Sequence, residues 1–483
     1  MLRLPVIALA AAAFGLFHAS SATAGGPGLI LGAAEDGVKG ETLVATKARL
    51  TVFRLAGFAA VRITSNWTPG ATAPTADQLR VLQNVAGAGQ LAGVRVFVSV
   101  YSPGSATTPL TPEAQAQFAQ YTAALVRDVP QIDDVIVANE PNLNRFWLPQ
   151  FGPDGKNASA PAYLTLLAQT YDAIKAVDPG VRVYGGALAP RGSDRPDLQR
   201  QTSSPTGFIQ ALGAAYRASG RTTPIMDAFS MHPYADNSAQ SPDFQHPNST
   251  TISLNDYGKL VTLLGQAFDG TAQPGSTLPI LYDEFGVESQ VPPGRAKAYT
   301  GAEPATTKPV PEAQQAAYYQ RALQLAFCQP NVIGMLLFHS HDESALPSWQ
   351  SGVFYADGAP KSSLPFVRDA LDRTRGGSVA RCEGLQLTVG TASARLPNLS
   401  DLRAGRLDPR FSCTLDCVWE ASLLKDGTPL VTRRGFARAR VTTFARLGTP
   451  TLSPGTYRFT ITLTHPVNPG TPFIREGRDL VLA

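Results

Sequence analysis

Two glutamates stand directly after short apolar segments of this 483-residue chain. Glu140 follows residues 134–138 within the motif Asn139-Glu140-Pro141, and Glu284 follows residues 279–282. Two carboxyl groups that face each other can break a glycosidic bond, because one protonates the leaving oxygen while the other attacks the sugar carbon or activates water. Either glutamate alone could equally be a helix-start residue or a solvated loop charge. Because both glutamates follow an apolar segment in the same way, a shared catalytic role is favoured over two unrelated loop charges.

The elements that must position these glutamates come from one long alternation of short apolar segments and longer amphipathic segments. Each short segment is almost entirely apolar, so we expect a parallel sheet that is buried on both faces. Eight repeats predict an α/β fold, and they fit a (β/α)8 TIM barrel better than an open Rossmann sheet. The predicted strands are residues 29–32, 60–64, 94–100, 134–138, 181–185, 228–231, 279–282 and 332–338. The predicted helices are residues 76–87, 112–127, 160–177, 206–218, 255–268 and 312–327.

Catalytic groups of such a barrel occupy the loops after the strands. Glu140 follows the fourth predicted strand and Glu284 follows the seventh, so both would lie at the same mouth. The first turn between a strand and a helix, residues 31–36, has no G-x-G-x-x-G motif, so a dinucleotide site is not supported. The sequence therefore predicts chemistry by paired carboxyl groups.

The motif Asn139-Glu140-Pro141 after the fourth strand and Glu284 after the seventh resemble clan A glycoside hydrolases, in particular families 5 and 39. The resemblance covers residues 28–372 and implies a barrel that hydrolyses with retention of anomeric configuration. It implies that Glu140 is the general acid/base and that Glu284 is the nucleophile. We therefore expect a glycoside hydrolase that cleaves O-glycosidic bonds of a polysaccharide or glycoconjugate by double displacement, without a cofactor.

Further residues fit the same resemblance. Arg62 sits where the clan places an arginine that supports the nucleophile, and His232 and Tyr234 would contact substrate and nucleophile after the sixth strand. A cationic Arg62 and a hydrogen bond from Tyr234 would favour an ionised Glu284. Asn139 can donate to the sugar 2-hydroxyl, an interaction that strengthens in the transition state.

Two segments depart from the resemblance. Family 5 members usually carry a His after strand three, where this chain has residues 99–102 reading Ser-Val-Tyr-Ser, and residues 338–341 lack the Trp that many clan members place after strand eight. These differences leave the sugar open. Trp67, Trp147 and Trp349 follow strands two, four and eight, where they could stack on sugar rings or equally pack a loop onto the barrel.

Two other functions stay open. His232, His339, His341 and Asp342 could serve a metal-dependent barrel hydrolase, since His-x-His at a strand end can bind zinc. Strand one offers no His, however, and no candidate for a carboxylated lysine ends strand four, so no metal is expected. A non-catalytic carbohydrate-binding or envelope protein on a degenerate barrel is the other alternative. The two glutamates together with Arg62 argue against it.

From about residue 384 the pattern changes to short strands separated by turns, without helices between them. It predicts a small all-β sandwich, which could bind glycans or only stabilise the barrel. We divide the chain into a signal peptide (1–24), a catalytic barrel (25–375) and a C-terminal sandwich (380–483), with a linker near 372–379. The predicted sandwich strands are residues 385–389, 417–424, 436–441, 456–463 and 479–482.

The N-terminus is typical of export. A short basic start (1–3), an apolar segment (4–17) and Ala22-Thr23-Ala24 predict a signal peptide that is cleaved after Ala24, and hence a secreted protein. No other segment has the apolar length of a membrane span. The four cysteines of an exported chain allow three pairings. The short spacing favours Cys413 with Cys417, which leaves Cys328 with Cys382.

The charge balance argues against nucleic acid as a partner. The chain has 41 Lys and Arg against 37 Asp and Glu, a net charge of +4, and no block of basic residues. This near-neutral balance suits a neutral or mildly charged glycan better than a polyanion. We expect a monomer whose partner is its carbohydrate substrate.

Overall fold

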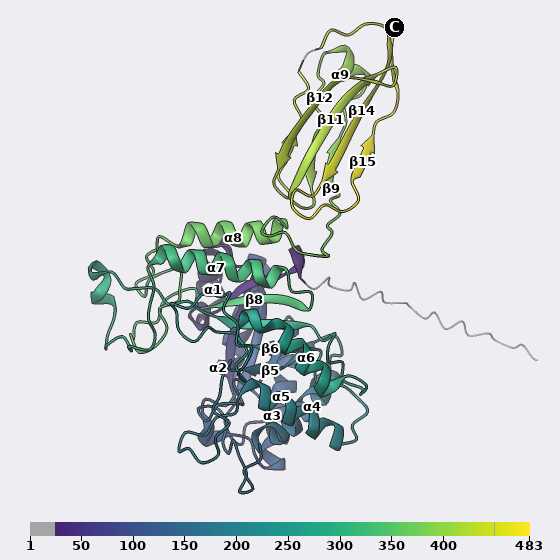
Figure 1. Ribbon diagram of the computed structural model, residues 1–483. Helices are drawn as coiled ribbons and strands as arrows, with labels where there is room; N and C mark the ends of the chain where they lie inside the picture. The colour runs from purple at the N-terminus through teal and green to yellow at the C-terminus, as the bar shows by residue number, and fades with distance from the viewer. Residues whose placement is uncertain (1–24, 449) are drawn as a thin grey trace, which may run out of the picture.

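The computed structural model describes residues 25–448 and 450–483. The predicted signal peptide (1–24), with its cleavage site after Ala24, lies outside the described residues. Among the residues described, none of the helices has the length and apolar character needed to cross a membrane. Figure 1 shows a barrel wrapped by helices and, beyond one end of helix α8, a slender β-domain that contains the C-terminus.

Eight parallel strands close into a barrel in chain order, which confirms the predicted (β/α)8 fold. Closure comes from pairing of the first strand with the eighth, from Ile30 opposite Gly334 to Ala34 opposite Phe338. The strands are β1 (Ile30–Ala34), β2 (Ala60–Asn66), β3 (Arg95–Tyr101), β4 (Asp134–Val137), β5 (Arg182–Leu188), β6 (Ala228–Met231), β7 (Ile280–Phe285) and β8 (Val332–Phe338).

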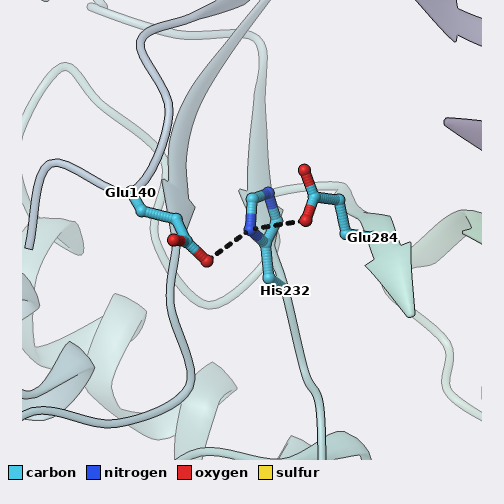
Figure 2. A group of neighbouring side chains, drawn as sticks. All are labelled: Glu140, His232 and Glu284. Carbon is cyan, nitrogen blue, oxygen red and sulfur yellow. Dashed lines mark hydrogen bonds and ion pairs between the residues drawn. The ribbon is translucent and has the colours of Figure 1, made fainter. Parts of the chain in front are cut away.

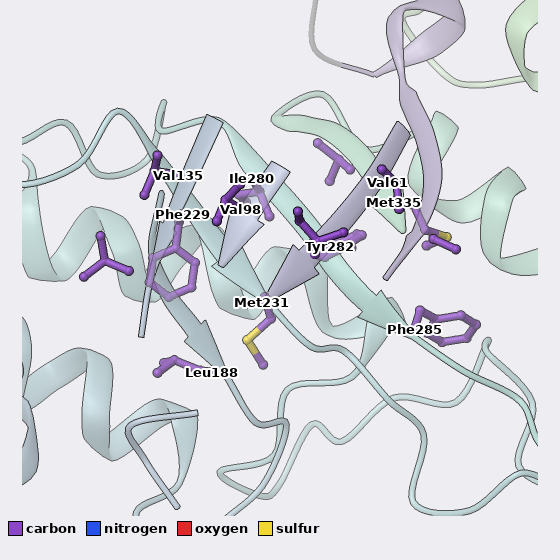
Figure 3. Packing of buried hydrophobic residues seen from close by; sticks show 14 of the residues in the cluster. Val61, Val98, Val135, Leu188, Phe229, Met231, Ile280, Tyr282, Phe285 and Met335 are labelled. Carbon is purple, nitrogen blue, oxygen red and sulfur yellow. The ribbon is translucent and has the colours of Figure 1, made fainter. Parts of the chain in front are cut away.

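Successive side chains of these strands point to opposite faces of the sheet. One set, which includes Val61 and Tyr282, belongs to the main hydrophobic core between the sheet and the helices (Figure 3). The other set, which includes Ala60 and Leu281, forms a separate buried cluster inside the barrel. A Cβ added at Gly32 would lie 1.8 Å from the carbonyl oxygen of Ala60, so β1 can approach β2 only with glycine at this position. Apolar residues, from the small Ala60 to the large Phe97 and Tyr184, thus fill the barrel floor.

The inward-facing set turns polar toward the C-terminal ends of the strands. Two residues beyond Ala60 stands Arg62, and two residues beyond Leu281 stands Asp283, and both are buried. The same alternation that fills the barrel floor therefore places a charged layer directly above it. This layer is the base on which the site is built.

Strand β7 is longer than the predicted strand 279–282, because it continues to Phe285. Its register against β8 shifts over these last residues, which is the signature of a β-bulge. The bulge lets the adjacent Asp283 and Glu284 both reach Arg62, although successive residues of a regular strand would point apart. Glu284 therefore belongs to the strand and not to the loop after it.

The six helices named from the sequence are all confirmed, and two that were not named there, α1 and α8, complete the ring. Helix α1 has no clear amphipathic pattern in the sequence, because its apolar residues Val44, Val52 and Leu55 are exposed. Helix α8 continues to Gly376, so the predicted linker 372–379 begins too early. The barrel helices are α1 (Leu43–Leu55), α2 (Ala76–Ala92), α3 (Pro112–Asp128), α4 (Ser159–Val177), α5 (Pro205–Ala218), α6 (Tyr257–Phe268), α7 (Glu312–Phe327) and α8 (Leu364–Gly376). Short 3-10 helices are η1 (Gly26–Gly28), η2 (Asp36–Val38), η3 (Ser105–Thr107), η4 (Leu254–Asp256) and η5 (Pro293–Ala298).

The C-terminal region forms two antiparallel sheets around its own hydrophobic core, as predicted for a sandwich. One sheet has the order β13-β10-β9 and the other β12-β11-β14-β15, with β16 beside β14. The elements are β9 (Thr391–Arg395), α9 (Leu399–Arg403), β10 (Arg410–Cys413), β11 (Cys417–Lys425), β12 (Thr428–Ala437), β13 (Thr443–Phe444), β14 (Gly455–Thr464), β15 (Phe473–Glu476) and β16 (Leu480–Leu482).

Three predictions for this region were wrong in detail. The strand expected at 385–389 is only an isolated bridge between Leu387 and Pro469. The strand expected at 436–441 is mostly a turn, because β12 already ends at Ala437. The short helix α9 interrupts the strands, and its start is fixed by a capping box that turn-like polar residues concealed in the sequence.

The junction between barrel and sandwich is held covalently and by hydrogen bonds. The disulfide Cys328–Cys382 ties α7 to the connecting segment, and Cys413–Cys417 closes the turn between β10 and β11. Both pairings were predicted. The amide of Asp416 also donates to the carbonyl of Gly376 over 2.9 Å, at the end of α8. The boundary between 375 and 380 stays a prediction.

Candidate active site

A cavity of about 690 Å³ opens at the C-terminal ends of the barrel strands. Both predicted glutamates line it, and they come from opposite parts of the barrel wall. The carboxylate oxygens of Glu140 and Glu284 that face each other lie within 4.8 Å, with a nitrogen of His232 between them (Figure 2). Other lining residues used below are Arg62, Asn139, Tyr234, Phe338, Glu343 and Trp349.

Glu140 is positioned by an unusual turn after β4. Both Ala138 (φ 70°) and Glu140 (φ 41°) adopt left-handed backbone conformations that are costly for residues with a side chain. The amide of Glu140 donates to the carbonyl of Ala187 over 2.8 Å, and its own carbonyl accepts from Leu143 over 2.8 Å. These bonds hold the strained turn, and the turn directs the carboxyl group into the cavity.

Glu284 is held by two donors at its two oxygens. The guanidinium of Arg62 donates to Oε1, and the hydroxyl of Tyr234 donates to Oε2 over 2.9 Å. Burial, and then the negative charge of Glu284, raise the pKa of Tyr234 well above its ordinary value, so the phenol keeps its proton and remains a donor. Both contacts fix the position of the Glu284 carboxyl group. These are the interactions that a nucleophile needs.

His232 lies between the two glutamates and is fully buried. Its Nδ1 is 3.0 Å from Glu140 and 3.4 Å from Glu284, while its Nε2 is 3.2 Å from Asp283 (Figure 2 shows the first two contacts). Burial alone would lower the pKa of His232, but the charges of Glu284 and Asp283 and the hydrogen bonds of its ring raise it to about 10. His232 is therefore an imidazolium near neutral pH, with Nδ1 hydrogen-bonded to Glu140 and Nε2 in an ion pair with Asp283.

Asp283 completes the charged layer below the cavity. It lies 3.6 Å from the Nε of Arg62 and accepts a hydrogen bond from Ser230. Burial would raise the pKa of Asp283, but His232 and Arg62 outweigh it and lower the pKa. Asp283, Glu284 and Glu140 thus lie around the two cations Arg62 and His232. Glu140 is the carboxyl group that Arg62 does not contact.

Asn139 is fixed by Arg62 as well. Its Oδ1 accepts from the guanidinium over 2.9 Å, so its amide NH₂ group is the end that remains to donate toward the cavity. Arg62 therefore sets the orientation of two site residues at once. A substrate hydroxyl beside Glu284 would find a donor already aligned.

The three tryptophans that were considered for sugar stacking have different places. Trp349 lines the cavity and packs against Tyr234, with ring centroids 4.8 Å apart, so it can offer an apolar face to a sugar ring. Trp67 is fully buried, packs on Phe118 and donates to the carbonyl of Ala71, so the candidate role of Trp67 in substrate binding is withdrawn.

Trp147 is also buried, and it packs edge-on against Tyr163 beneath the loop after β4. Only the tryptophan after the eighth strand therefore faces the cavity. Trp67 and Trp147 instead pack loops onto the barrel, which was the other role open to them.

The residues considered for a metal are not gathered. Asp342 binds Lys361 over 2.7 Å, and His341 stacks on Phe354. Within residues 25–448 and 450–483, the one group of three or more such side chains close enough to share an ion is Glu140, His232 and Glu284. There the protonated ring of His232 contacts both glutamates and Arg62 contacts Glu284, so the donor set does not fit a cation.

Sequence reasoning missed two acidic residues of the site. Asp283 stands next to Glu284, and an apolar strand that ends in two acids was a signal for a second buried charge. Glu35 lines the cavity and accepts hydrogen bonds from Ser340 and from the amide of His341, which joins the loops after β1 and β8. Burial opposes ionisation of Glu35, but its hydrogen bonds with His341 and Ser340 and the charge of His339 lower its pKa to about 2.

Comparison with known proteins places the fold. No protein-family model and no curated protein matches the chain. A GH5_18 protein of Streptomyces cattleya, solved with GlcNAc, has a TM-score of 0.50 and 17% identity and matches 74% of this chain and 83% of its own. A glucosidase from Croceicoccus marinus has a TM-score of 0.47 and 13% identity, with coverages of 82% and 88%.

A β-glucuronidase of Bacteroides uniformis has a TM-score of 0.45 and 14% identity, and it matches 94% of this chain but 46% of its own. This chain thus spans under half of the length of that protein. All three are glycoside hydrolases by description. At these identities the likeness concerns the fold, and the GH5_18 match agrees with the (β/α)8 barrel.

Proposed function

We propose that this protein is a secreted, retaining glycoside hydrolase in which Glu140 is the acid/base and Glu284 the nucleophile. The observation that carries the proposal is the pair of carboxylates within 4.8 Å across the cavity. Retaining enzymes separate their carboxyl groups by about 5–5.5 Å, whereas inverting enzymes need about 6.5–9.5 Å to admit a water. The GH5_18 protein that carries GlcNAc on a similar fold adds support.

In the first half-reaction, Glu140 gives its proton to the glycosidic oxygen while a carboxylate oxygen of Glu284 attacks the anomeric carbon. The C–O bond to the leaving group breaks, and a glycosyl ester forms on Glu284. Arg62 and Tyr234 hold the attacking carboxylate in place, so little reorganisation is needed as it reacts. Asn139 would donate to the 2-hydroxyl of the sugar.

In the second half-reaction, the ionised Glu140 takes a proton from water, and the water oxygen displaces Glu284 from the anomeric carbon. His232 contacts both glutamates and can follow the shift of negative charge from one to the other without moving. Two inversions at one carbon give net retention. No cofactor or metal takes part in these steps.

The class of substrate is inferred from the aromatic and polar side chains that line the cavity. Trp349 and Phe338 form an apolar surface, while Asn139, Glu35 and the glutamates present donors and acceptors around it. This combination suits a sugar ring, which has apolar faces and a polar edge. We expect a polysaccharide or glycoconjugate substrate and a monomeric enzyme that is exported after cleavage at Ala24.

The test begins with a panel of chromogenic aryl glycosides and defined polysaccharides. With the substrate found there, Glu284→Ala should lower turnover about 10⁴-fold or more, since it removes the nucleophile. Glu140→Ala should be rescued by azide, an anion that attacks the glycosyl ester without a general base. The exposed Glu383→Ala is the matched control and should keep full activity. Near-normal turnover of Glu284→Ala would contradict the proposal.

A further inference from the structure

The charge of the chain is divided unequally between its two parts. Residues 25–379 have 26 Lys and Arg against 29 Asp and Glu, a net charge of −3, whereas residues 380–483 have 14 against 8, a net charge of +6. Thirteen of those 14 basic residues are arginines. The nearly neutral total therefore hides a basic sandwich attached to an acidic barrel.

Part of this charge gathers in a second cavity, of about 570 Å³, on the sandwich. It lies over the three-stranded sheet and the turn after α9, far along the chain from the catalytic glutamates. Four arginines and one aromatic ring line it, and we call this site the arginine cleft. Its basic and aromatic lining residues are Arg395, Arg406, Arg410, Phe444 and Arg446.

Strand register explains how these side chains meet. Arg410 of β10 pairs with Arg395 of β9 on one side and with Phe444 of β13 on the other. Directly paired residues point to the same face of a sheet, so two guanidinium groups and a phenyl ring lie in one row. Arg446 follows Phe444 by two residues, with the buried Ala445 between them. Like charges placed directly opposite each other destabilise a sheet unless a counter-charge joins them.

Carboxylates inside the cleft neutralise only part of this charge. Asp401 accepts two hydrogen bonds from Arg406, over 3.0 and 2.9 Å, and lies 3.5 Å from Arg395. Arg410 and Arg446 have no ion pair or side-chain hydrogen bond with any residue of 25–448 or 450–483. Two guanidinium forks beside an exposed phenyl ring are thus left to bind an anion.

We infer that the arginine cleft binds an anionic glycan through the carboxylate or sulfate groups on its sugars. The guanidinium fork matches the geometry of such groups and binds them through two parallel hydrogen bonds. Phe444 is 55% exposed and offers a face for a sugar ring beside the charges. The cleft is a bounded cavity that includes two aspartates, which fits a short charged segment better than the continuous basic stripe that tracks a nucleic-acid backbone.

The choice of a glycan as the carrier of the anion rests on the proposed function of the barrel. On that basis the sandwich holds a charged polymer while the barrel cleaves its glycosidic bonds. A chain that is bound at one site is then present at a high local concentration near the other. The cleft takes no part in the chemical steps. Its loss would therefore affect a polymer and spare a small aryl glycoside.

The experiment measures binding by the full-length protein with Glu284→Gln, so that no hydrolysis interferes. The probes are polygalacturonate and chondroitin sulfate, with dextran as the neutral control. We expect both anionic chains, or one of them, to bind at least tenfold more tightly than dextran, and the preference shows whether carboxylate or sulfate is read. Arg410→Ala/Arg446→Ala should remove about tenfold or more of that affinity.

The matched control is Arg475→Ala/Arg478→Ala, which removes the same charge from exposed positions outside the cleft. An equal loss of affinity in this control would contradict the assignment of the arginine cleft as the binding site. The absence of binding to both anionic chains would contradict it as well. Binding of equal strength to phosphatidylglycerol vesicles or to duplex DNA would contradict the proposal that the ligand is a glycan. Failure of the proposed function is seen separately, because aryl-glycoside hydrolysis is measured with Glu284 intact, with and without Arg410→Ala/Arg446→Ala, and depends only on the barrel.

Discussion

Arg62 at the barrel mouth and Arg410 on the sandwich carry the same charge in opposite circumstances. Arg62 is buried and contacts Glu284, Asp283 and Asn139, so its charge is paired within the protein. Arg410 is exposed and pairs with no carboxylate among the described residues. The comparison shows that burial with fixed partners makes an arginine part of the framework of the candidate site, whereas exposure without partners leaves it available to a ligand.

The largest expected effect comes from removing the buried Arg62, measured against removal of an arginine of the sandwich whose ion pairs are exposed. Arg62→Met leaves two buried carboxylates without their cation, and such a change costs about 3–5 kcal/mol of stability. We expect kcat/KM to fall about 10³-fold as Glu284 loses its support. Arg458→Met in the sandwich breaks two exposed ion pairs, with Asp479 and Glu476, and should cost less than about 1 kcal/mol.

Urea unfolding of both variants, with activity measured on the folded fraction, checks this prediction. Equal stability losses would show that the buried network is not special. A stable but inactive Arg62→Met variant would show that Arg62 supports activity and contributes little to stability.

Two tryptophans within the barrel separate packing from binding. Trp67→Ala removes a fully buried ring and should destabilise the protein by about 3–5 kcal/mol. Trp349→Ala should raise KM about tenfold and leave the free energy of unfolding nearly unchanged, because this ring lines the cavity. Thermal unfolding and steady-state kinetics of the pair distinguish the two roles, and a KM effect in Trp67→Ala without destabilisation would contradict the assignment.

The two disulfides should contribute unequally. Cys328–Cys382 spans 54 residues and anchors the junction, whereas Cys413–Cys417 spans four within the sandwich. Loop-closure entropy predicts stabilisation of about 4 kcal/mol for the long loop and about 2 kcal/mol for the short one. Calorimetry of the two double Cys→Ala variants tests the order, which an equal or reversed effect would refute.

Two histidines should give the domains opposite responses to pH. The pKa of His232 is raised from 6.5 to about 10, so its stabilising contribution is complete below pH 6.5 and is lost as the pH rises through about 10. Burial lowers the pKa of His465 in the sandwich, so its contribution is complete above pH 6.5 and is lost on acidification.

The free energy of unfolding from pH 4 to pH 10.5 measures both effects. His232→Gln should remove the alkaline loss and leave the acid loss in place. An alkaline loss that persists in this variant would show that another group titrates there.

Apolar periodicity was enough to predict the barrel and to bring both glutamates to its C-terminal end, where they line the cavity, although Glu284 lies within β7 and not in the loop after it. It could not predict the bulge that turns Asp283 and Glu284 the same way, since a bulge depends on the register of β7 against β8. Nor could it tell Trp349 from Trp67, which differ only in what packs around them.

The arginine cleft shows a second limit of sequence reasoning. Net charge over the whole chain averaged an acidic barrel with a basic sandwich and pointed to a nearly neutral partner. The row formed by Arg395, Arg410 and Phe444 comes from pairing between strands that are separate in sequence. Long-range register, and not composition, brings that site together.

The stereochemistry of the first product tests the central claim most directly. With the aryl glycoside identified by the panel, proton NMR during the first turnovers should show release of the sugar with the anomeric configuration of the substrate. That result is required if Glu284 forms a glycosyl ester that Glu140 then hydrolyses. Initial release of the opposite anomer would contradict the account, because it would require a single displacement by water.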